Sequence, residues 1–173
     1  MTTMKQFRWF WAWEDEKEEA WLREMALKGW HFVSVSLPGN YTFELGEPRD
    51  DVYRLDYFAG QKKDKSDYLQ LFLDTGWEYK GEMNGWQYFC QQAVNGELPD
   101  IYSDHESKAR KYQRIMLIMV IFLPIYMNLI FIGSRHQNEL AAVVSIILAA
   151  FLLLYSYILV RLLMRVNQLR KKL

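Results

Sequence analysis

Two long apolar runs dominate the C-terminal part of the sequence. Residues 115–133 and 140–160 contain no charged side chain. Helices of these lengths span about 28 and 31 Å, close to the roughly 30 Å hydrocarbon core of a bilayer. Buried core helices are the alternative, but the preceding domain could hardly cover two helices that are apolar on every face. Because only residues 134–139 connect the runs, the pattern predicts a two-helix transmembrane hairpin over residues 115–160.

Basic residues cluster at one end of this hairpin. The connection contains only Arg135, whereas nine basic residues flank the apolar runs on the other side: Lys108, Arg110, Lys111, Arg114, Arg161, Arg165, Arg170, Lys171 and Lys172. Cytoplasmic loops of membrane proteins are enriched in Lys and Arg. We therefore expect a multi-pass protein of the cell membrane with both termini in the cytoplasm. Residues 161–173 form its basic tail, with membrane lipids as partners.

Small and polar side chains recur within the apolar runs. Ala141, Ser145 and Ala149 are spaced four residues apart, a pattern that permits close helix packing. Reflecting the hairpin about its turn places Asn128 level with Ser145, so we expect a hydrogen bond between them. This surface packs either within the hairpin or against a second copy in a homodimer. The runs contain no Asp, Glu, Lys, Arg or His, which argues against a proton relay or an ion pathway.

The N-terminal half shows shorter periodicities. Apolar and other residues alternate over residues 7–13 and again over 53–58, which predicts two strands. A helix is expected after each strand, the first beginning with the solvated acidic run 14–19 and the second near Ser66. Each helix is followed by Gly-Trp, at Gly29-Trp30 and Gly76-Trp77, which fits a left-handed helix cap with the tryptophan folded back on the helix.

A hairpin is expected to close each half. Residues 32–36 and 41–44 flank a Pro-Gly-Asn turn, and residues 78–82 and 86–90 flank Asn-Gly. The order βαββ thus occurs twice, as an internal repeat. This order predicts an α+β fold with one antiparallel sheet and two helices on one of its faces. The predicted organisation is a domain at 1–98, a polar and basic linker at 99–114, the hairpin at 115–160 and the tail at 161–173.

Charge separates the two parts of the chain, although the formal net charge is zero. Residues 1–104 contain 11 basic and 19 acidic side chains, whereas residues 105–173 contain 10 and 2. An acidic domain does not suit nucleic acid as a partner. A single cysteine excludes an intramolecular disulfide and is compatible with the cytoplasm.

The sequence contains no recognisable catalytic or cofactor motif. The three histidines are widely separated, and with one cysteine they do not form a metal-binding pattern. There is no phosphate-binding loop, dinucleotide fingerprint or nucleophile elbow. We expect no cofactor, no metal and no enzymatic activity.

Arginine and aromatic residues are the candidates for ligand binding. Arg8 and Arg54 occupy equivalent positions in the repeat and could hold an anion, although pairing with acidic or aromatic neighbours is the alternative. Glu44, Asp56 and Glu78 lie among aromatic residues, which suits an organic cation. The candidate ligand-binding set is Arg8, Arg54, Trp9, Trp11, Tyr57 and Trp86.

Several short motifs, in order, resemble a bacterial family known as domain of unknown function 2812. They are Phe7-Arg8-Trp9-Phe10, the segment from Glu18 through Trp21-Leu22 to Gly29-Trp30, Tyr41-Thr42-Phe43-Glu44, Tyr53-Arg54-Leu55-Asp56-Tyr57, Gly76-Trp77 and Trp86-Gln87-Tyr88-Phe89. The resemblance covers about residues 5–105 and implies a membrane-anchored protein encoded near PadR-like regulators, without established catalytic residues. The βαββ repeat also looks like the effector-binding domains of GyrI-like multidrug sensors, in architecture only.

Two functional hypotheses follow. The first is a non-enzymatic, membrane-tethered sensing or interaction module that binds a small organic ligand or a protein through its aromatic cytoplasmic domain. The alternative is an accessory subunit of a membrane transporter that acts through its transmembrane hairpin.

Overall fold

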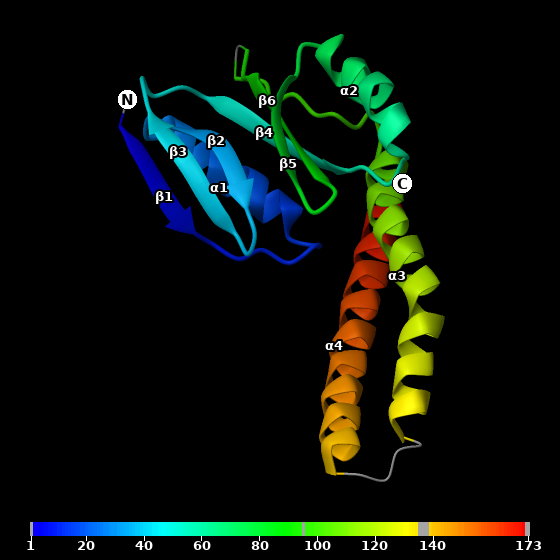
Figure 1. Ribbon diagram of the computed structural model, residues 1–173. Coiled ribbons are helices and arrows are strands. Elements are labelled where there is room, and N and C mark those ends of the chain that lie inside the picture. The colour runs from blue at the N-terminus through cyan, green and yellow to red at the C-terminus, as the bar shows by residue number, and fades with distance from the viewer. Residues whose placement is uncertain (1, 95, 135–138, 172–173) are drawn as a thin grey trace. The chain divides into compact units, whose positions relative to one another are not determined.

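The computed structural model describes residues 2–94, 96–134 and 139–171 (Figure 1). The side chains of residues 133, 134, 139 and 141 also lie outside this description. The chain divides into two compact units, Met1–Ser103 and Asp104–Leu173. Each unit is described by itself.

The first unit has the predicted α+β composition and element order. Its elements are β1 (Thr3–Phe7), α1 (Asp15–Leu27), β2 (Trp30–Ser36), β3 (Asn40–Leu45), β4 (Asp51–Tyr57), the 3₁₀ turn η1 (Lys62–Asp64), α2 (Lys65–Leu73), β5 (Glu78–Met83) and β6 (Trp86–Gln92). Each half of the unit therefore reads strand, helix, strand, strand.

The strands form two three-stranded antiparallel sheets, not the single sheet that we expected. The first sheet has the order β1-β3-β2 and the second the order β4-β6-β5. β2 and β5 lie side by side without forming a ladder. Each of these strands has a bulge where it pairs with its neighbour, between Phe32 and Ser34 and between Tyr79 and Gly81. Bulges bend and twist a strand, which explains why the two edges do not merge into one sheet.

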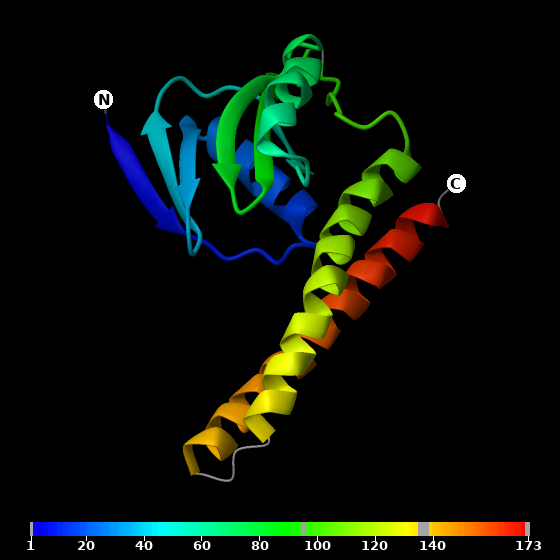
Figure 2. The ribbon, with the colours of Figure 1, turned by 45° about the vertical axis from the view of Figure 1, so that its right-hand side comes forward.

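The two helices cover opposite faces of the second sheet, so the expectation of both on one face was wrong. Trp21 and Leu22 of α1 share a core with Tyr53 and Leu55 of β4. Val52, which alternates with these residues along β4, belongs instead to a separate cluster with the side chains of α2. In Figure 2 the blue helix α1 and the green helix α2 lie on either side of the second sheet.

Helix α1 joins the two halves. Its core also includes Phe32 and Phe43 of the first sheet, and Tyr88 of the second. The first sheet buries only the face that α1 covers, whereas β4 and β6 of the second sheet have buried side chains on both faces. The second sheet is therefore the middle layer of the unit.

The aromatic run 7–13 is not a strand, contrary to its alternating pattern. β1 begins earlier and ends at Phe7, where it pairs with Asn40. Beyond it, the guanidinium of Arg8 lies over the rings of Phe10 and Trp21, 5.2 and 4.9 Å from their centroids. The chain then turns into α1, which leaves no partner strand for this run.

Both helix-capping glycines have the predicted left-handed conformation, with φ of +83° at Gly29 and +87° at Gly76. After α2 the cap is a complete Schellman motif: the Gly76 N–H donates to Leu73 O (3.0 Å), and the Trp77 N–H donates to Phe72 O (3.0 Å). Trp77 is buried in the cluster that contains Phe72, as predicted. Trp30 is only half-buried, at the edge of the α1 core.

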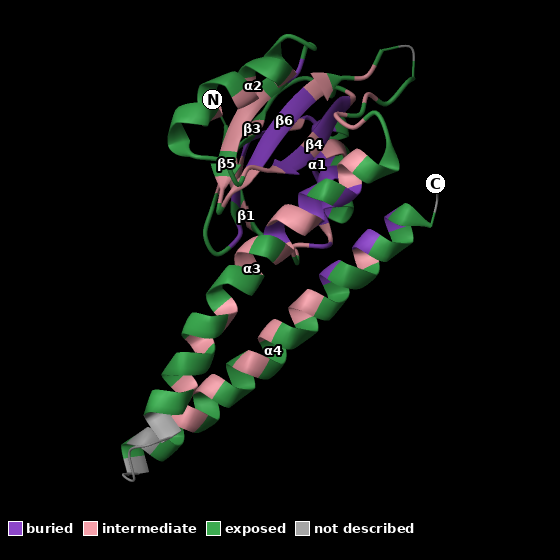
Figure 3. Ribbon diagram, turned by 90° about the vertical axis from the view of Figure 1, so that its right-hand side faces the viewer, coloured by how far each residue is buried: buried purple, intermediate pink, exposed green. Residues whose placement is uncertain are grey.

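The second unit consists of α3 (His105–Ser134) and α4 (Glu139–Arg170). Both helices are long and apolar enough to cross a membrane. Most of their apolar side chains are exposed (Figure 3). Most of the segment that we assigned to a linker is thus helical, and α4 extends through most of the predicted tail. Residues 135–138, which include Arg135, lie outside the described residues.

Tyrosines connect the two helices. The Tyr126 hydroxyl donates to Leu148 O (2.7 Å), the Tyr155 hydroxyl donates to Met119 O, and the two rings stack with centroids 6.3 Å apart.

The expected bond between Asn128 and Ser145 is absent. The Asn128 amide donates to Pro124 O in its own helix (3.1 Å), because this carbonyl is one turn back and within easy reach. The buried Ser145 Oγ has no hydrogen-bond partner within the described part of the chain. Ala149 is exposed, and the side chain of Ala141 is not described.

Candidate ligand groove

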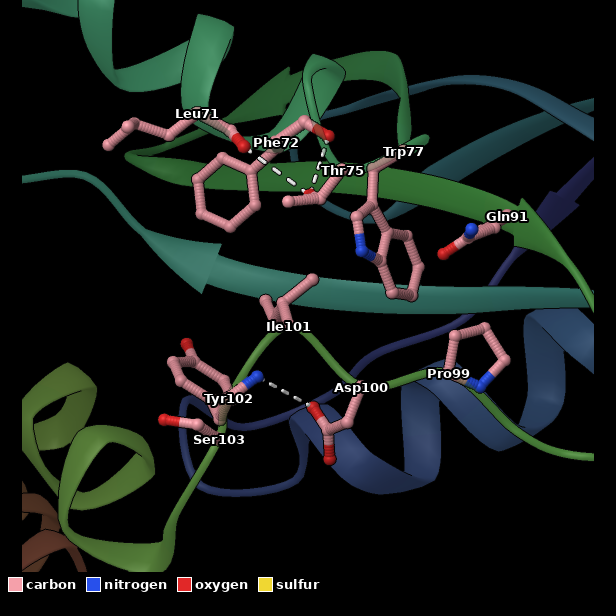
Figure 4. Close-up of a pocket in the computed structure, with 10 residues that line it drawn as sticks. All are labelled: Leu71, Phe72, Thr75, Trp77, Gln91, Pro99, Asp100, Ile101, Tyr102 and Ser103. Atoms are coloured by element: carbon pink, nitrogen blue, oxygen red, sulfur yellow. Dashed lines mark hydrogen bonds between the residues drawn. The ribbon is translucent and has the colours of Figure 1, made fainter.

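An open cleft of about 660 Å³ lies beside α2 in the first unit (Figure 4). Its lining residues are Leu71, Phe72, Thr75, Trp77, Gln91, Pro99, Asp100, Ile101, Tyr102 and Ser103. One wall is the end of α2, and the opposite wall is the segment 99–103. Its size lies in the range of small-molecule sites.

Packing of the segment 99–103 against the second sheet builds this groove. Ile101 contacts the cluster of Val52, Trp77 and Phe89. In Figure 4 the side chain of Ile101 points toward the space between Phe72 and Trp77. The Tyr102 hydroxyl donates to Asp56 Oδ1 (2.6 Å). These contacts bring the segment into the compact unit, which ends at Ser103.

The groove lining contains one charged residue, Asp100, and the buried carboxylates of Glu19 and Asp56 lie behind it. Asp100 Oδ1 accepts the Tyr102 N–H (3.2 Å) and lies 3.6 Å from Arg54 Nε. The same guanidinium is 3.6 Å from the buried carboxylate of Glu19. Asp56, which is buried, also accepts a bond from the Tyr68 hydroxyl (2.9 Å). Tyrosine hydroxyls and Arg54 thus compensate the carboxylates around the groove, which provides no Lys or Arg in its lining.

None of the six predicted ligand-binding residues lines this groove. Arg8 lies on aromatic rings, and Arg54 is paired with carboxylates, so the alternative that we considered for both holds in the structure. Trp9 and Trp11 are exposed and meet edge to face, with centroids 5.8 Å apart.

Tyr57 and Trp86 form a separate pair on the second sheet, with ring centroids 5.6 Å apart. The six candidates therefore do not form one site. Of them, only Arg54 reaches the groove, through Asp100.

Sequence reasoning missed the groove because it assigned residues 99–103 to a polar linker. The available signal was the apolar pair Ile101-Tyr102 within that stretch. The aromatic residues of α2 and Trp77 were predicted only as core.

A buried acidic centre was also missed. The run 14–19 was expected to be solvated, but Asp15, Glu18 and Glu19 are buried. Glu18 Oε1 accepts hydrogen bonds from the hydroxyls of Tyr41 and Tyr88, each at 2.6 Å. Burial raises the pKa of the Glu18 carboxyl above its ordinary value, and the two hydroxyl donors offset part of that effect.

A second cleft of about 490 Å³ lies where β2 and β5 meet, and Val33 and Lys80 are in its lining. His31 also lines this cleft: its Nδ1 is 3.1 Å from Asp51 Oδ2, and its Nε2 is 2.8 Å from Glu47 O. The described residues contain no group of three or more His, Cys, Asp or Glu side chains that could hold a metal ion.

Comparisons with known proteins place the chain in a family. No curated protein and no solved structure matches it. A family model matches residues 14–123, which include the whole groove and extend into α3. Since this match covers more than half of the 173 residues, the chain belongs to the family described as "Protein of unknown function (DUF2812)".

Proposed function

We propose that this protein is a membrane-anchored, non-enzymatic binding module whose groove beside α2 takes a small organic ligand. The observation that carries the proposal is the groove itself, whose wall 99–103 runs directly into α3. A ligand that contacts this wall acts on the chain only a few residues before the first apolar helix. The module can thereby report occupancy to the membrane.

The lining favours an amphipathic ligand with a flat apolar part. Phe72, Trp77 and Tyr102 supply aromatic surface. Asp100 supplies a carboxylate that Arg54 compensates only from 3.6 Å, and the Asp100 side chain is 40% exposed. With no basic residue in the lining, a positive charge or a hydrogen-bond donor on the ligand is favoured over an anion.

A matched set of probes tests this proposal. We would titrate the full chain in micelles with 1-naphthylmethylammonium, 1-naphthalenemethanol and 1-naphthoate by calorimetry, with empty micelles as the blank. The ammonium probe should bind tightest and the carboxylate weakest.

Variants identify the site in the same experiment. Ile101→Trp should abolish binding because it fills the groove, whereas Asp100→Asn should remove the preference for the ammonium probe. Val33→Trp, the same kind of change in the second cleft, is the control and should bind like the parent. Equal binding by all variants would refute the assignment of the groove.

We propose further that the protein is multi-pass with both termini in the cytoplasm, on the basis of the flanking basic residues. A cysteine at Lys62 should resist an impermeant thiol reagent added to intact cells, whereas one at Gln137 should react. The native Cys90 gives little background, because burial raises its pKa to about 12. The opposite labelling pattern would overturn this topology.

A transporter accessory role is the second candidate. It is favoured by α4, where Ala149 is exposed and the Ser145 hydroxyl has no partner in the described structure. Replacing Ala141 and Ala149 by Leu should abolish an accessory role but leave ligand binding in the groove unchanged.

We also infer that the first unit arose by internal repetition. The two halves have the same element order and strand order, and each has a bulge in the strand that follows its helix. This inference bears on origin and does not depend on the ligand.

A further inference from the structure

The first unit exposes an apolar patch that its core does not explain. Phe7, Trp9, Trp11 and Leu37 are 60%, 53%, 37% and 68% exposed. The patch lies where β1 ends beside the β2–β3 turn, since the Arg8 N–H donates to Gly39 O (3.0 Å). Large exposed aromatic side chains that gather in one place mark an interaction surface.

The patch is held in place by local bonds. The backbone N–H of Glu14 donates to the backbone carbonyl of Trp11 (2.8 Å). The Glu14 carboxylate in turn accepts a hydrogen bond from the backbone N–H of Trp11 (3.2 Å). The same carboxylate is 2.6 Å from Lys17 Nζ. Trp11 also stacks on Trp13, with centroids 5.3 Å apart. Trp11 is thus presented at little further entropic cost, and the ring of Trp9 meets it edge to face.

We propose that this patch inserts into the headgroup region of the bilayer that holds α3 and α4. Tryptophan prefers the membrane interface, where its ring is apolar and its N–H meets water. The exposed Lys5 and Arg8 beside the patch can interact with lipid phosphates. The inference rests on the proposed membrane anchorage and adds a second, peripheral contact to it.

The length of the connection makes this contact reachable. The compact unit ends at Ser103, and the first uncharged run begins at Ile115. The intervening turns of α3 extend about 15 Å. A unit of this size has a radius of gyration of about 13 Å, so it is held close enough to touch the headgroups. Tethering also raises the effective concentration of the bilayer at the patch.

A second copy of the chain is the less suitable occupant. Four side chains that are about half exposed offer roughly 400 Å², whereas a stable interface buries about 800 Å² on each partner. A lipid surface sets no such minimum, because each inserted ring contributes separately.

Tryptophan fluorescence provides a direct test, because all seven tryptophans lie in the first unit and none in α3 or α4. The full chain would be reconstituted in phosphatidylcholine vesicles, plain or brominated near the top of one acyl chain. Bromine quenches only rings that contact lipid. Emission should fall in the brominated vesicles by up to the share of two tryptophans in seven.

Two variants assign the quenching. The double variant Trp9→Phe/Trp11→Phe should lose the quenched component but keep the apolar contact. Trp86→Phe, which changes a half-buried ring that packs on Tyr57, should keep the quenched component.

The experiment distinguishes failure of the patch proposal from failure of the membrane anchorage. Equal emission in plain and brominated vesicles, from chains that still float with the vesicles after an alkaline carbonate wash, would overturn the patch proposal alone. Chains that the wash removes would overturn the membrane anchorage. Emission that changes with the protein-to-lipid ratio but not with bromination would assign the patch to a second copy and would also overturn the proposal.

Discussion

Glu18 illustrates how one buried carboxyl connects both halves of the first unit. It lies on α1 and accepts hydroxyls from Tyr41 of the first sheet and Tyr88 of the second. The Glu18→Ala variant leaves both buried hydroxyls without this acceptor, so we expect it to lower the free energy of unfolding by about 1 to 3 kcal/mol for each hydroxyl. Urea unfolding of the full chain in micelles, followed by tryptophan emission, measures this loss.

The pH dependence of the same group has a defined sign. The pKa of Glu18 is raised in the folded state, so its contribution to stability is complete below about pH 4.3 and declines as the pH rises through the folded value. Relative to Glu18→Gln, the parent should therefore lose stability as the pH rises from about 4.3 through the folded pKa of Glu18. Glu24→Gln, an exposed change on the same helix, should show no such loss. A parent that gains stability relative to Glu18→Gln over this range would contradict the burial effect.

Trp77 and Trp30 follow equivalent glycines but differ in burial. Truncation of the buried Trp77 to Ala should cost about 3 to 5 kcal/mol of unfolding free energy. The same truncation of the half-buried Trp30 should lower the unfolding free energy by clearly less. Denaturant midpoints of the two variants, measured side by side, check this order, and equal midpoints would show that burial does not set the cost.

At the scale of elements, the helix hairpin depends on two tyrosine hydroxyls that donate to backbone carbonyls across it. Tyr126→Phe and Tyr155→Phe should each destabilise it by about 0.5 to 1.5 kcal/mol. Asn128→Ala removes a bond within one helix and is the matched control. Mixed-micelle unfolding, followed by energy transfer between dyes at Ile132 and Ala142, measures the difference.

Periodicity predicted the elements better than their arrangement. The glycine caps and turn residues are local signals, and they gave the helices and hairpins of the first unit. Whether α1 and α2 share a face depends on which side of β4 each helix packs against. Val52 faces α2 and Tyr53 faces α1, but both residues count as apolar in a sequence pattern, so the pattern does not show which helix covers which face. The prediction of a strand over residues 7–13 was wrong for a related reason, since an alternating pattern alone does not supply a partner strand.

The groove could not be predicted because it forms between segments distant in sequence. Its wall 99–103 resembles a linker in composition and becomes part of the unit only through Ile101 and Tyr102. Arg54 was identified as a candidate, but its carboxylate partners Glu19 and Asp100 lie far from it along the chain.

At the scale of the molecule, the boundary of the first unit is testable. A fragment of residues 1–103 should fold, because its core includes both sheets and α1. A fragment of residues 1–98 should be less stable by at least about 1.5 kcal/mol, since it lacks the bond from Tyr102 to the buried Asp56. Urea midpoints of the two fragments decide between the boundaries, and equal midpoints would return the boundary to residue 98.

The attachment of the segment 99–103 also has a mechanical consequence. Tension applied to α3 acts first on the segment 99–103, whose contacts include the Tyr102 bond to Asp56, the 3.6 Å ion pair of Asp100 with Arg54 and the packing of Ile101. The strands behind this segment are held by antiparallel ladders of backbone hydrogen bonds and resist such a load far better. Lateral stretching of the bilayer would therefore peel this wall away and widen the groove while both sheets remain intact, so that force and ligand would compete for the same few contacts.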